Sequence, residues 1–344
     1  MIQFQCDYNE GCHPLIMQRL AESNLEQTIG YGEDHYCQEA KILIKSACQR
    51  EDIDVHFLVG GTQTNTTIIA HTLRPYQGVI SAHTGHINVH ETGAIESTGH
   101  KVLAISSNDG KLTALQISEA MQNHLHEDGP EHMVQPGMVY LSFPTEVGTI
   151  YTYEELRAIR EVCDQYQLPL FIDGARLGYG ISSPQCNISL PQLARLADAF
   201  YIGGTKVGAL FGEAVVIAND KLKQDFRYSI KQHGGMLAKG RLLGIQFATL
   251  FTNNLYFQIA EHATNEALRI KSALEEKGIA FLIDSPTNQQ FPIFTHQQLT
   301  ALSQEFLFSI WQHVDDKHTA VRICTSWATK SENVDRLIQA IHKL

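Results

Sequence analysis

The stretch that decides the fold is YIGGTKVGALFG, residues 201–212, in which a lysine stands in a glycine-rich break. Short apolar runs flank the break at residues 199–202 and 214–217, and both are typical of buried strands. Lys206 is therefore predicted to lie in the turn between two strands. Such surroundings would remove water from the amine, lower its pKa and free it for Schiff-base chemistry with a carbonyl compound. The alternative is a surface lysine in an ordinary glycine turn.

The composition narrows the class of protein. With 344 residues the chain is long enough for two domains, and 43% hydrophobic residues fit a globular protein. Because 26 Lys and Arg stand against 37 Asp and Glu, the net charge of −11 argues against nucleic acid as a partner. Seven cysteines without a Cys-x-x-Cys pair are typical of reduced cytosolic thiols. Neither a signal-like start nor a membrane-length apolar run is present, so we expect a cytoplasmic protein that does not bind a membrane.

A second candidate site follows the predicted strand at residues 54–59. Gly61 and Thr62 lie in the turn GGTQTN, residues 60–65, which leads into a helix. Glycines at such a turn let backbone N–H groups reach an anion, and the positive end of the helix dipole holds it. This predicts a phosphate site, but the pattern is neither a Walker motif nor a complete Gly-x-Gly-x-x-Gly, so the indication of a nucleotide is weak. An ordinary tight turn with Thr62 as the helix cap is about equally compatible.

Histidines cluster after the next predicted strand, at residues 78–82. His83, His86 and His90 lie together with Glu91 within nine positions, and such a group could form a metal site. An imidazole at the carboxyl end of a strand could equally stack on a flat ligand. The residues alone leave both interpretations open.

A carboxylate ends the mostly apolar run at residues 168–173. Asp173 is thereby carried to a strand terminus, where an ionised carboxylate in a dry site needs a cationic partner. A protonated pyridine nitrogen would be such a partner. The structural alternatives are a salt bridge with Arg176 or a helix N-cap.

Strands and helices alternate over most of the chain. This pattern predicts a mostly parallel sheet whose ligand site lies at the carboxyl ends of the strands. From about residue 254 the pattern changes to a long helix at 254–277, strands at 280–283, 291–293 and 321–324, and a closing helix at 334–342. We therefore expect a large α/β domain at 15–253 and a smaller C-terminal α/β domain at 254–344, which the N-terminal segment 1–14 joins.

A phosphate loop, a stacking imidazole, a strand-end aspartate and a desolvated lysine are the contacts that pyridoxal phosphate requires. Together with the motifs at 4–7, 61–65, 91–94, 173–176, 205–208, 234–236 and 321–325, they make the sequence resemble the threonine aldolase and β-eliminating lyase family over nearly its whole length. The resemblance implies the α/β fold of PLP-dependent transferases, fold type I, with a large, mostly parallel seven-stranded sheet. It also implies pyridoxal 5′-phosphate as the cofactor, no metal, and a homodimer or homotetramer with shared active sites.

Carried over residue by residue, the resemblance implies specific cofactor contacts. Lys206 would form the Schiff base with the cofactor, and Asp173 would be the partner of the pyridine nitrogen. His86 would stack on the ring. Gly61 and Thr62 would bind the phosphate.

The same resemblance implies the contacts to a substrate. Arg322, from the smaller domain, would bind the α-carboxylate, and Arg176 would lie near the same carboxylate or the phenolic oxygen of the cofactor. Two guanidinium groups that face one carboxylate can fix the scissile bond perpendicular to the ring. Cys6, another expected substrate contact, stands where typical aldolases have serine.

Glu146 occupies the position where the family has a histidine that handles the substrate hydroxyl. The resemblance therefore implies a catalytic set of Lys206, His86 and Glu146, with Glu146 as the base. Desolvation would raise the pKa of this carboxylate, whereas a cationic cofactor would lower it. A salt bridge to a neighbouring arginine is the structural alternative.

The reaction implied by the resemblance is retro-aldol cleavage of a β-hydroxy-α-amino acid, such as L-threonine or L-allo-threonine to glycine and acetaldehyde. The alternatives are β-elimination or transamination of another amino acid, and a non-catalytic protein that binds the cofactor. Arg176 and Arg322 favour an enzyme, since a non-catalytic protein needs no clamp for a substrate carboxylate. The departures at Cys6 and Glu146 leave the substrate side chain open.

Overall fold

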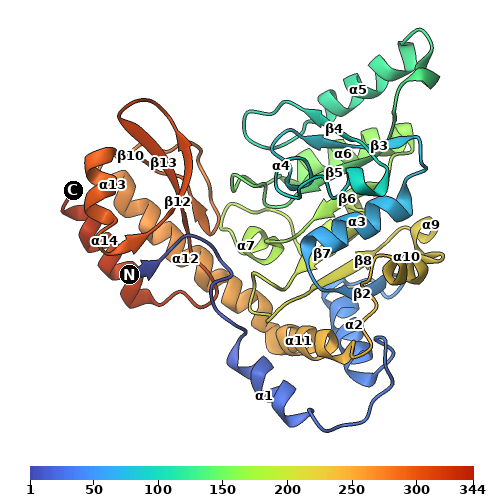
Figure 1. The fold of residues 1–344 in the computed structure, drawn as a ribbon, viewed down its shortest axis with the longest axis horizontal. Coiled ribbons are helices and arrows are strands. Elements are labelled where there is room, and N and C mark those ends of the chain that lie inside the picture. The colour runs from blue at the N-terminus through green and yellow to red at the C-terminus, as the bar shows by residue number, and fades with distance from the viewer.

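The computed structural model describes residues 1–344, which form a large α/β unit and a smaller unit beside it (Figure 1). The large unit is built on a seven-stranded sheet of order β2-β8-β7-β6-β5-β3-β4. Its strands are β2 (Asp54–Leu58), β3 (Gln77–Ala82), β4 (Val102–Ile105), β5 (Gln135–Ser142), β6 (Leu170–Asp173), β7 (Ala199–Gly203) and β8 (Glu213–Ile217). Only β8 runs against its neighbours, so the prediction of a mostly parallel seven-stranded sheet is confirmed.

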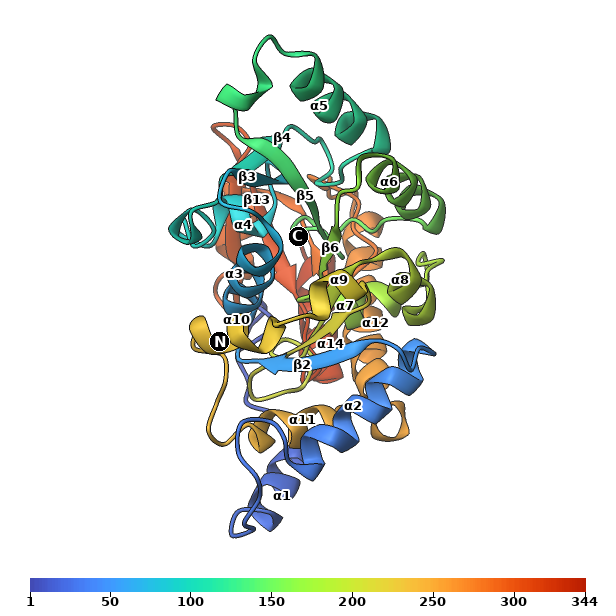
Figure 2. The same ribbon diagram turned by 90° about the vertical axis from the view of Figure 1, so that its right-hand side faces the viewer.

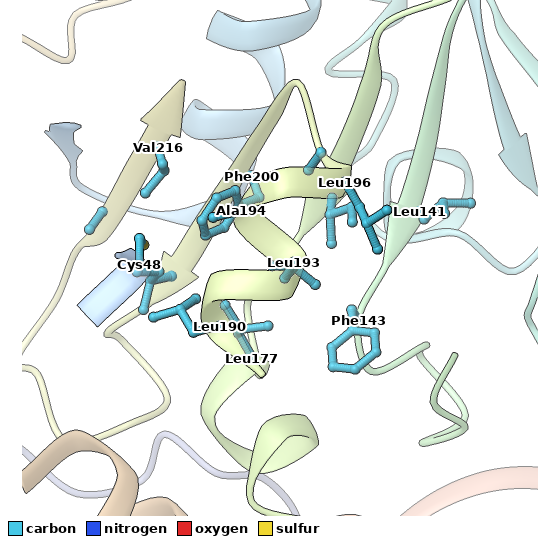
Figure 3. Close-up of a cluster of buried hydrophobic side chains, with 14 of the residues drawn as sticks. Cys48, Leu141, Phe143, Leu177, Leu190, Leu193, Ala194, Leu196, Phe200 and Val216 are labelled. Carbon is cyan, nitrogen blue, oxygen red and sulfur yellow. The ribbon is translucent and has the colours of Figure 1, made fainter. Parts of the chain in front are cut away.

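Helices cover both faces of this sheet (Figure 2). One face packs against α3 (Gly61–Thr72), α4 (His86–Val89) and α10 (Phe226–Gln232), and the other packs against α2 (His35–Cys48), α6 (Tyr153–Tyr166) and α8 (Leu190–Leu196). Because side chains alternate along a strand, Phe171 faces α3 whereas its neighbour Ile172 faces the opposite core. Figure 3 shows part of that second core, where Leu193 of α8 lies near Phe200 of β7.

The remaining helices of the large unit flank this framework. Capping boxes at Thr113 and Thr152 begin α5 (Ala114–His126) and α6. The other elements are α1 (Pro14–Glu22), α5 (Ala114–His126), α7 (Leu177–Ile181), α9 (Asp220–Lys223), α11 (Arg241–Phe251), and the short 3₁₀ turns Glu96–Thr98, Pro130–His132 and Thr252–Asn254. None of the helices combines the length and apolarity that a membrane crossing requires.

The smaller unit begins with the long helix α12 (Leu255–Glu276), which extends from the large unit into the smaller one (Figure 1). It continues with β9 (Gln289–Gln290), β10 (Ile293–Thr295), α13 (His296–Leu302), β11 (Phe306–Leu307), β12 (Ser309–His313), β13 (His318–Cys324) and α14 (Ser331–His342). The N-terminal strand β1 (Ile2–Gln3) pairs with β11. These contacts support our proposal of domains at 15–253 and 254–344, with segment 1–14 attached to the second.

One expected strand and one alternative interpretation of a helix start are wrong. Residues 280–283 do not form a strand, because the segment makes a single bridge, between Phe281 and Pro292. Thr62 is not a helix cap, because α3 begins one residue earlier and Gly60 is its N-cap residue. Gly60 has no side chain to bond the first N–H groups of α3, so these groups are available to a ligand.

Candidate active site

A pocket lies at the carboxyl ends of β5, β6 and β7, on the side covered by α3. Eleven residues line it, and its empty volume is about 560 Å³. Seven of the nine residues singled out from the sequence are among them: Gly61, Thr62, His86, Glu146, Asp173, Arg176 and Lys206. The other two, Cys6 and Arg322, do not line this pocket.

Lys206 lies in the turn between β7 and β8, as the sequence predicted. The turn is fixed by backbone bonds, because the N–H groups of Gly204 and Thr205 both donate to the carbonyl of Gly212 at 3.0 Å. The hydroxyl of Tyr179 donates to the backbone carbonyl of Lys206 at 2.5 Å. The lysine side chain is half-buried and lines the pocket. The alternative of an ordinary surface lysine does not fit this placement.

Glu213 binds the same turn through its carboxylate. The sequence analysis did not identify this residue. Its carboxylate accepts hydrogen bonds from the N–H of Gly204 at 3.0 Å and from the hydroxyl of Thr205 at 2.8 Å. Burial raises the pKa of Glu213 to about 7, although the positive charge of Lys206 acts to lower it. A buried carboxylate that titrates near neutrality therefore contacts the turn that carries Lys206.

Asp173 is enclosed by hydrogen-bond donors. Its Oδ1 accepts from the Tyr201 hydroxyl at 2.5 Å and the Ala175 N–H at 3.0 Å, and its Oδ2 accepts from the Tyr140 hydroxyl at 2.6 Å and Asn65 Nδ2 at 3.1 Å. Burial and then the charge of Asp173 raise the pKa of both tyrosines well above the usual value, so both remain donors. Asp173 forms no salt bridge with Arg176 and caps no helix, so both structural alternatives are wrong.

The period of two along the strands explains this cluster. Asp173 lies on the same face of β6 as Phe171, and Tyr140 and Tyr201 point to that face from the two flanking strands. Directly after Asp173 the backbone of Gly174 passes very close to β7. A Cβ added to Gly174 would lie 1.9 Å from the carbonyl oxygen of Tyr201. Only glycine therefore allows β6 and β7 to meet in this way.

The N-terminus of α3 forms the floor of the pocket beside these strands. Its first internal hydrogen bond runs from the N–H of Thr64 to the carbonyl of Gly60, so the N–H groups of Gly61 and Thr62 have no acceptor within the helix. Gly61 also lies close to a strand, because an added Cβ would be 3.0 Å from the hydroxyl of Tyr201. This arrangement can hold an anion.

His86 begins α4 and is held by a buried carboxylate. Its Nδ1 lies 2.7 Å from Oε1 of Glu91, and the same oxygen accepts from Asn65 Nδ2 at 2.7 Å. Burial by itself lowers the pKa of His86, but the hydrogen bond to Glu91 and the charge of Asp173 raise it above the usual value. The histidines do not converge on a common point, because His83 accepts from the N–H of Ser107 instead. No three His, Cys, Asp or Glu side chains come together as a metal site.

Glu146 lies in the loop after β5. Its Oε1 accepts from the Ser142 hydroxyl at 2.5 Å and from the N–H of His86 at 2.8 Å, whereas its Oε2 is buried and has no partner. No arginine contacts this carboxylate, so the alternative of a salt bridge is wrong. Burial raises the pKa of Glu146 above its usual value, although the hydrogen bond from Ser142 opposes the shift. In the protein without cofactor, desolvation therefore outweighs the hydrogen bonds that Glu146 accepts.

Arg176 is anchored by Asp7, which the sequence analysis did not assign to the site. Its Nε and Nη2 donate to the Asp7 carboxylate at 2.7 and 3.0 Å, and Asn288 Nδ2 donates to the same carboxylate at 2.9 Å. Burial alone would raise the pKa of Asp7, but the charges of Arg176 and Lys206 hold it below the usual value. One guanidinium nitrogen of Arg176, Nη1, remains without a protein partner.

Arg322 lies on β13 of the smaller unit and bonds to the residue that precedes Cys6. Arg322 Nη2 donates to the carbonyl of Gln5 at 2.9 Å, Nη1 lies 3.4 Å from Oε1 of Gln289, and its buried Nε has no partner. The Cys6 thiol donates to Oδ1 of Asn9 at 3.0 Å. All seven cysteines are unpaired. Neither residue is in the wall of the pocket.

Comparison with known proteins identifies the family. The chain matches the family model described as "Beta-eliminating lyase" over residues 7–297. It is 29% identical to the low specificity L-threonine aldolase of Pseudomonas aeruginosa over 98% of this chain and 96% of that protein. A solved structure of Leishmania major threonine aldolase is 44% identical and superimposes with a TM-score of 0.97, covering 100% of this chain and 99% of that chain.

More distant structures show the same fold. The histidinol-phosphate aminotransferase of Clostridium acetobutylicum, at 11% identity, superimposes with a TM-score of 0.75 over 100% of this chain and 98% of that chain. The predicted α/β architecture of fold type I is therefore confirmed. The matches also confirm the predicted class, a threonine-aldolase-like carbon–carbon lyase. The chain belongs to the β-eliminating lyase family.

Proposed function

We propose that the protein cleaves a β-hydroxy-α-amino acid by a retro-aldol reaction, with L-threonine and L-allo-threonine as substrates. The observation that carries this proposal is the free Oε2 of Glu146, a buried carboxylate oxygen in the same pocket as Lys206 and Asp173. A proton acceptor at this place is what cleavage beside a hydroxyl requires.

The residues present fit pyridoxal 5′-phosphate, on which this family generally depends. The free N–H groups at the start of α3 offer a phosphate site at Gly61 and Thr62. Lys206 lines the pocket and can hold the cofactor covalently, while Asp173 can accept a hydrogen bond from the ring nitrogen and His86 can cover the ring. When bound, the cofactor supplies an electron sink for cleavage of a bond at the α-carbon.

Two arginines are available for the substrate carboxylate. Nη1 of Arg176 and the buried Nε of Arg322 lack protein partners, so each retains a donor. Asp7 fixes the plane of the Arg176 guanidinium and thereby limits the directions from which a carboxylate can bind. In this proposal Arg322 and Arg176 bind the carboxylate, and Cys6 lies at the edge of the substrate site.

Glu146 receives the proton of the β-hydroxyl in this proposal. Oε1 is held by Ser142 and the backbone of His86, which fixes the carboxylate of Glu146 in the wall of the pocket, and Oε2 has no protein partner. A pKa raised by burial makes this carboxylate a stronger base than an exposed one. Glu146 can also return the proton, because a group that titrates nearer to neutrality serves in both directions.

We also propose a cytoplasmic homodimer or homotetramer with shared active sites. Large apolar side chains are exposed on the segment between α1 and α2, with Leu25 at 92% and Ile29 at 71% exposure. Arg241 donates to the carbonyl groups of Asn24 and Glu26 in its own chain. It therefore shapes this segment from within one subunit.

A screen of amino acids with identification of the products tests the function. The protein loaded with pyridoxal 5′-phosphate should release glycine and acetaldehyde in equal amounts from L-threonine or L-allo-threonine. L-Alanine, which has no β-hydroxyl, is the control and should give no aldehyde. A keto acid without aldehyde would indicate transamination, and no spectral change with any amino acid would indicate a non-catalytic protein.

A further inference from the structure

Glu91 is a buried carboxylate without an arginine or lysine partner. Its side chain has no exposed surface, and its Oε2 has no hydrogen-bond partner. The one cationic group within bonding distance is the imidazole of His86, at 2.7 Å. Because an unpaired charge is costly to bury, the carboxylate of Glu91 favours the protonated, cationic form of the His86 imidazole beside it.

Asn65 connects this pair to Asp173. Its Nδ2 donates to Oε1 of Glu91 at 2.7 Å and to Oδ2 of Asp173 at 3.1 Å, which uses both hydrogens of the amide. The reversed amide would set an oxygen against two carboxylates, so the chemistry fixes its orientation. Asn65 itself is fully buried in α3.

We propose that Glu91 and Asn65 are positioning residues that join His86 to Asp173 in one chain of hydrogen bonds. Glu91 holds the imidazole proton at Nδ1 and fixes the plane of the ring against the pocket. Asn65 makes the state of that pair depend on the charge of Asp173. The functional meaning rests on the proposed function, in which His86 and Asp173 contact opposite parts of one cofactor.

The neighbouring groups agree with a hydrogen-bonded unit that runs from His86 to Asp173. The pKa of His86 is raised in spite of burial, and the pKa of Tyr140, which faces both carboxylates, is raised well above its usual value. Two groups oppose a charge on His86, namely Lys206 and His90, whose ring centre lies 5.5 Å away. The remaining groups that face the unit are Glu146, which accepts from the His86 backbone, Tyr201, which donates to Asp173, and Glu213.

Histidine NMR of the full-length chain without cofactor tests the first half of the proposal. The Cε1–H signal of His86, assigned by its loss in His86→Gln, is followed as a function of pH. In Glu91→Gln its titration midpoint should fall by about 1–3 pH units, because the variant lacks the negative charge that favours protonated His86. Glu96→Gln, an exposed glutamate of the same segment, is the matched control and should leave the midpoint unchanged. An unchanged midpoint in Glu91→Gln overturns the role of Glu91.

A double-mutant cycle tests the link through Asn65. Asp173→Asn should lower the His86 midpoint more in the wild-type background than in the Asn65→Ser background, because only the former has the connecting amide. Equal shifts in the two backgrounds would show that Asp173 acts through space alone and would overturn the role of Asn65. Asn123→Ser, on the exposed face of α5, is the control background.

The two experiments remain decisive if one variant does not fold. Circular dichroism identifies a variant that does not fold. If Glu91→Gln is that variant, the cycle with Asn65 can still be measured, because it leaves Glu91 unchanged. Because neither cofactor nor substrate is present, the outcome is independent of whether the chain is an aldolase. Failure of the link and failure of the proposed function are therefore distinguishable.

Discussion

Two carboxylates in the same pocket are treated in opposite ways by the fold. Asp173 accepts four hydrogen bonds, two on each oxygen, and three of the four donors are buried side chains. Glu146 accepts two bonds on one oxygen and none on the other. The first arrangement supplies donors to both oxygens of a carboxylate, whereas the second leaves an oxygen free to exchange a proton. The role of a buried carboxylate in this pocket therefore depends on which of its oxygens already accept hydrogen bonds.

The largest effect should come from replacing the carboxylate of Asp173. Asp173→Asn takes away the charge that would face the ring nitrogen and places an amide among four donors. Breaking a buried charge pair costs about 3–5 kcal/mol, so we expect turnover to fall by roughly 10²–10⁴-fold. Steady-state kinetics with L-threonine measures this. A fall of less than tenfold, with the cofactor still bound, would mean that Asp173 is a structural residue.

Glu146→Gln should lower cleavage by roughly 10²–10⁴-fold while substrate affinity and the fold are retained. The amide keeps an acceptor for Ser142 and His86 but cannot take a proton from the hydroxyl. Aldehyde release from a β-hydroxy amino acid, measured beside substrate-induced spectral change, separates cleavage from binding. Unchanged turnover would remove Glu146 from the mechanism.

Glu213 extends the comparison to a third buried carboxylate, which supports the lysine turn. Its pKa is raised from 4.5 to about 7, so the folded protein binds a proton more tightly than the unfolded chain does. This contribution to stability is fully present below pH 4.5 and is lost as the pH rises through 7. Relative to Glu213→Gln, the wild-type protein should lose roughly 3 kcal/mol of unfolding free energy across this window. Urea unfolding at several pH values checks the difference, and parallel curves for the two proteins would contradict it.

The smallest effect should come from single donors to Asp173. Tyr201→Phe or Tyr140→Phe leaves one carboxylate oxygen with one donor fewer, which should lower the unfolding free energy by about 1–3 kcal/mol. Tyr228→Phe, with 77% of its surface exposed, is the matched control and should have little effect. If the three variants unfold alike, the tyrosine bonds do not stabilise the buried anion.

The sequence predicted the parts of the site that follow directly from strand ends. Lys206 and Asp173 stand where apolar runs stop, and the alternation of strands and helices was enough to place both at one edge of the sheet. Tyr140 and Tyr201 were missed, although the period of two along β5 and β7 would have placed them on the same face as Asp173.

Other residues could not be found from local patterns. Asn65 meets Glu91 because α3 and α4 pack on one face of the sheet, and Asp7 reaches Arg176 across 169 positions of the chain. No periodicity encodes such long-range contacts. The false strand at 280–283 has a similar origin: Leu282 and Ile293 donate backbone bonds around a single bridge, so the apolar segment is extended but does not continue a ladder.

The measurement that tests the central claim most directly is borohydride reduction of the cofactor-loaded protein followed by peptide mapping. The account predicts a coloured protein in which reduction attaches the cofactor to the peptide that contains Lys206. Lys206→Ala should lose both the lysine-linked absorption and turnover, whereas the exposed Lys101→Ala should keep both. Attachment to any other lysine, or full turnover by Lys206→Ala, would contradict the account.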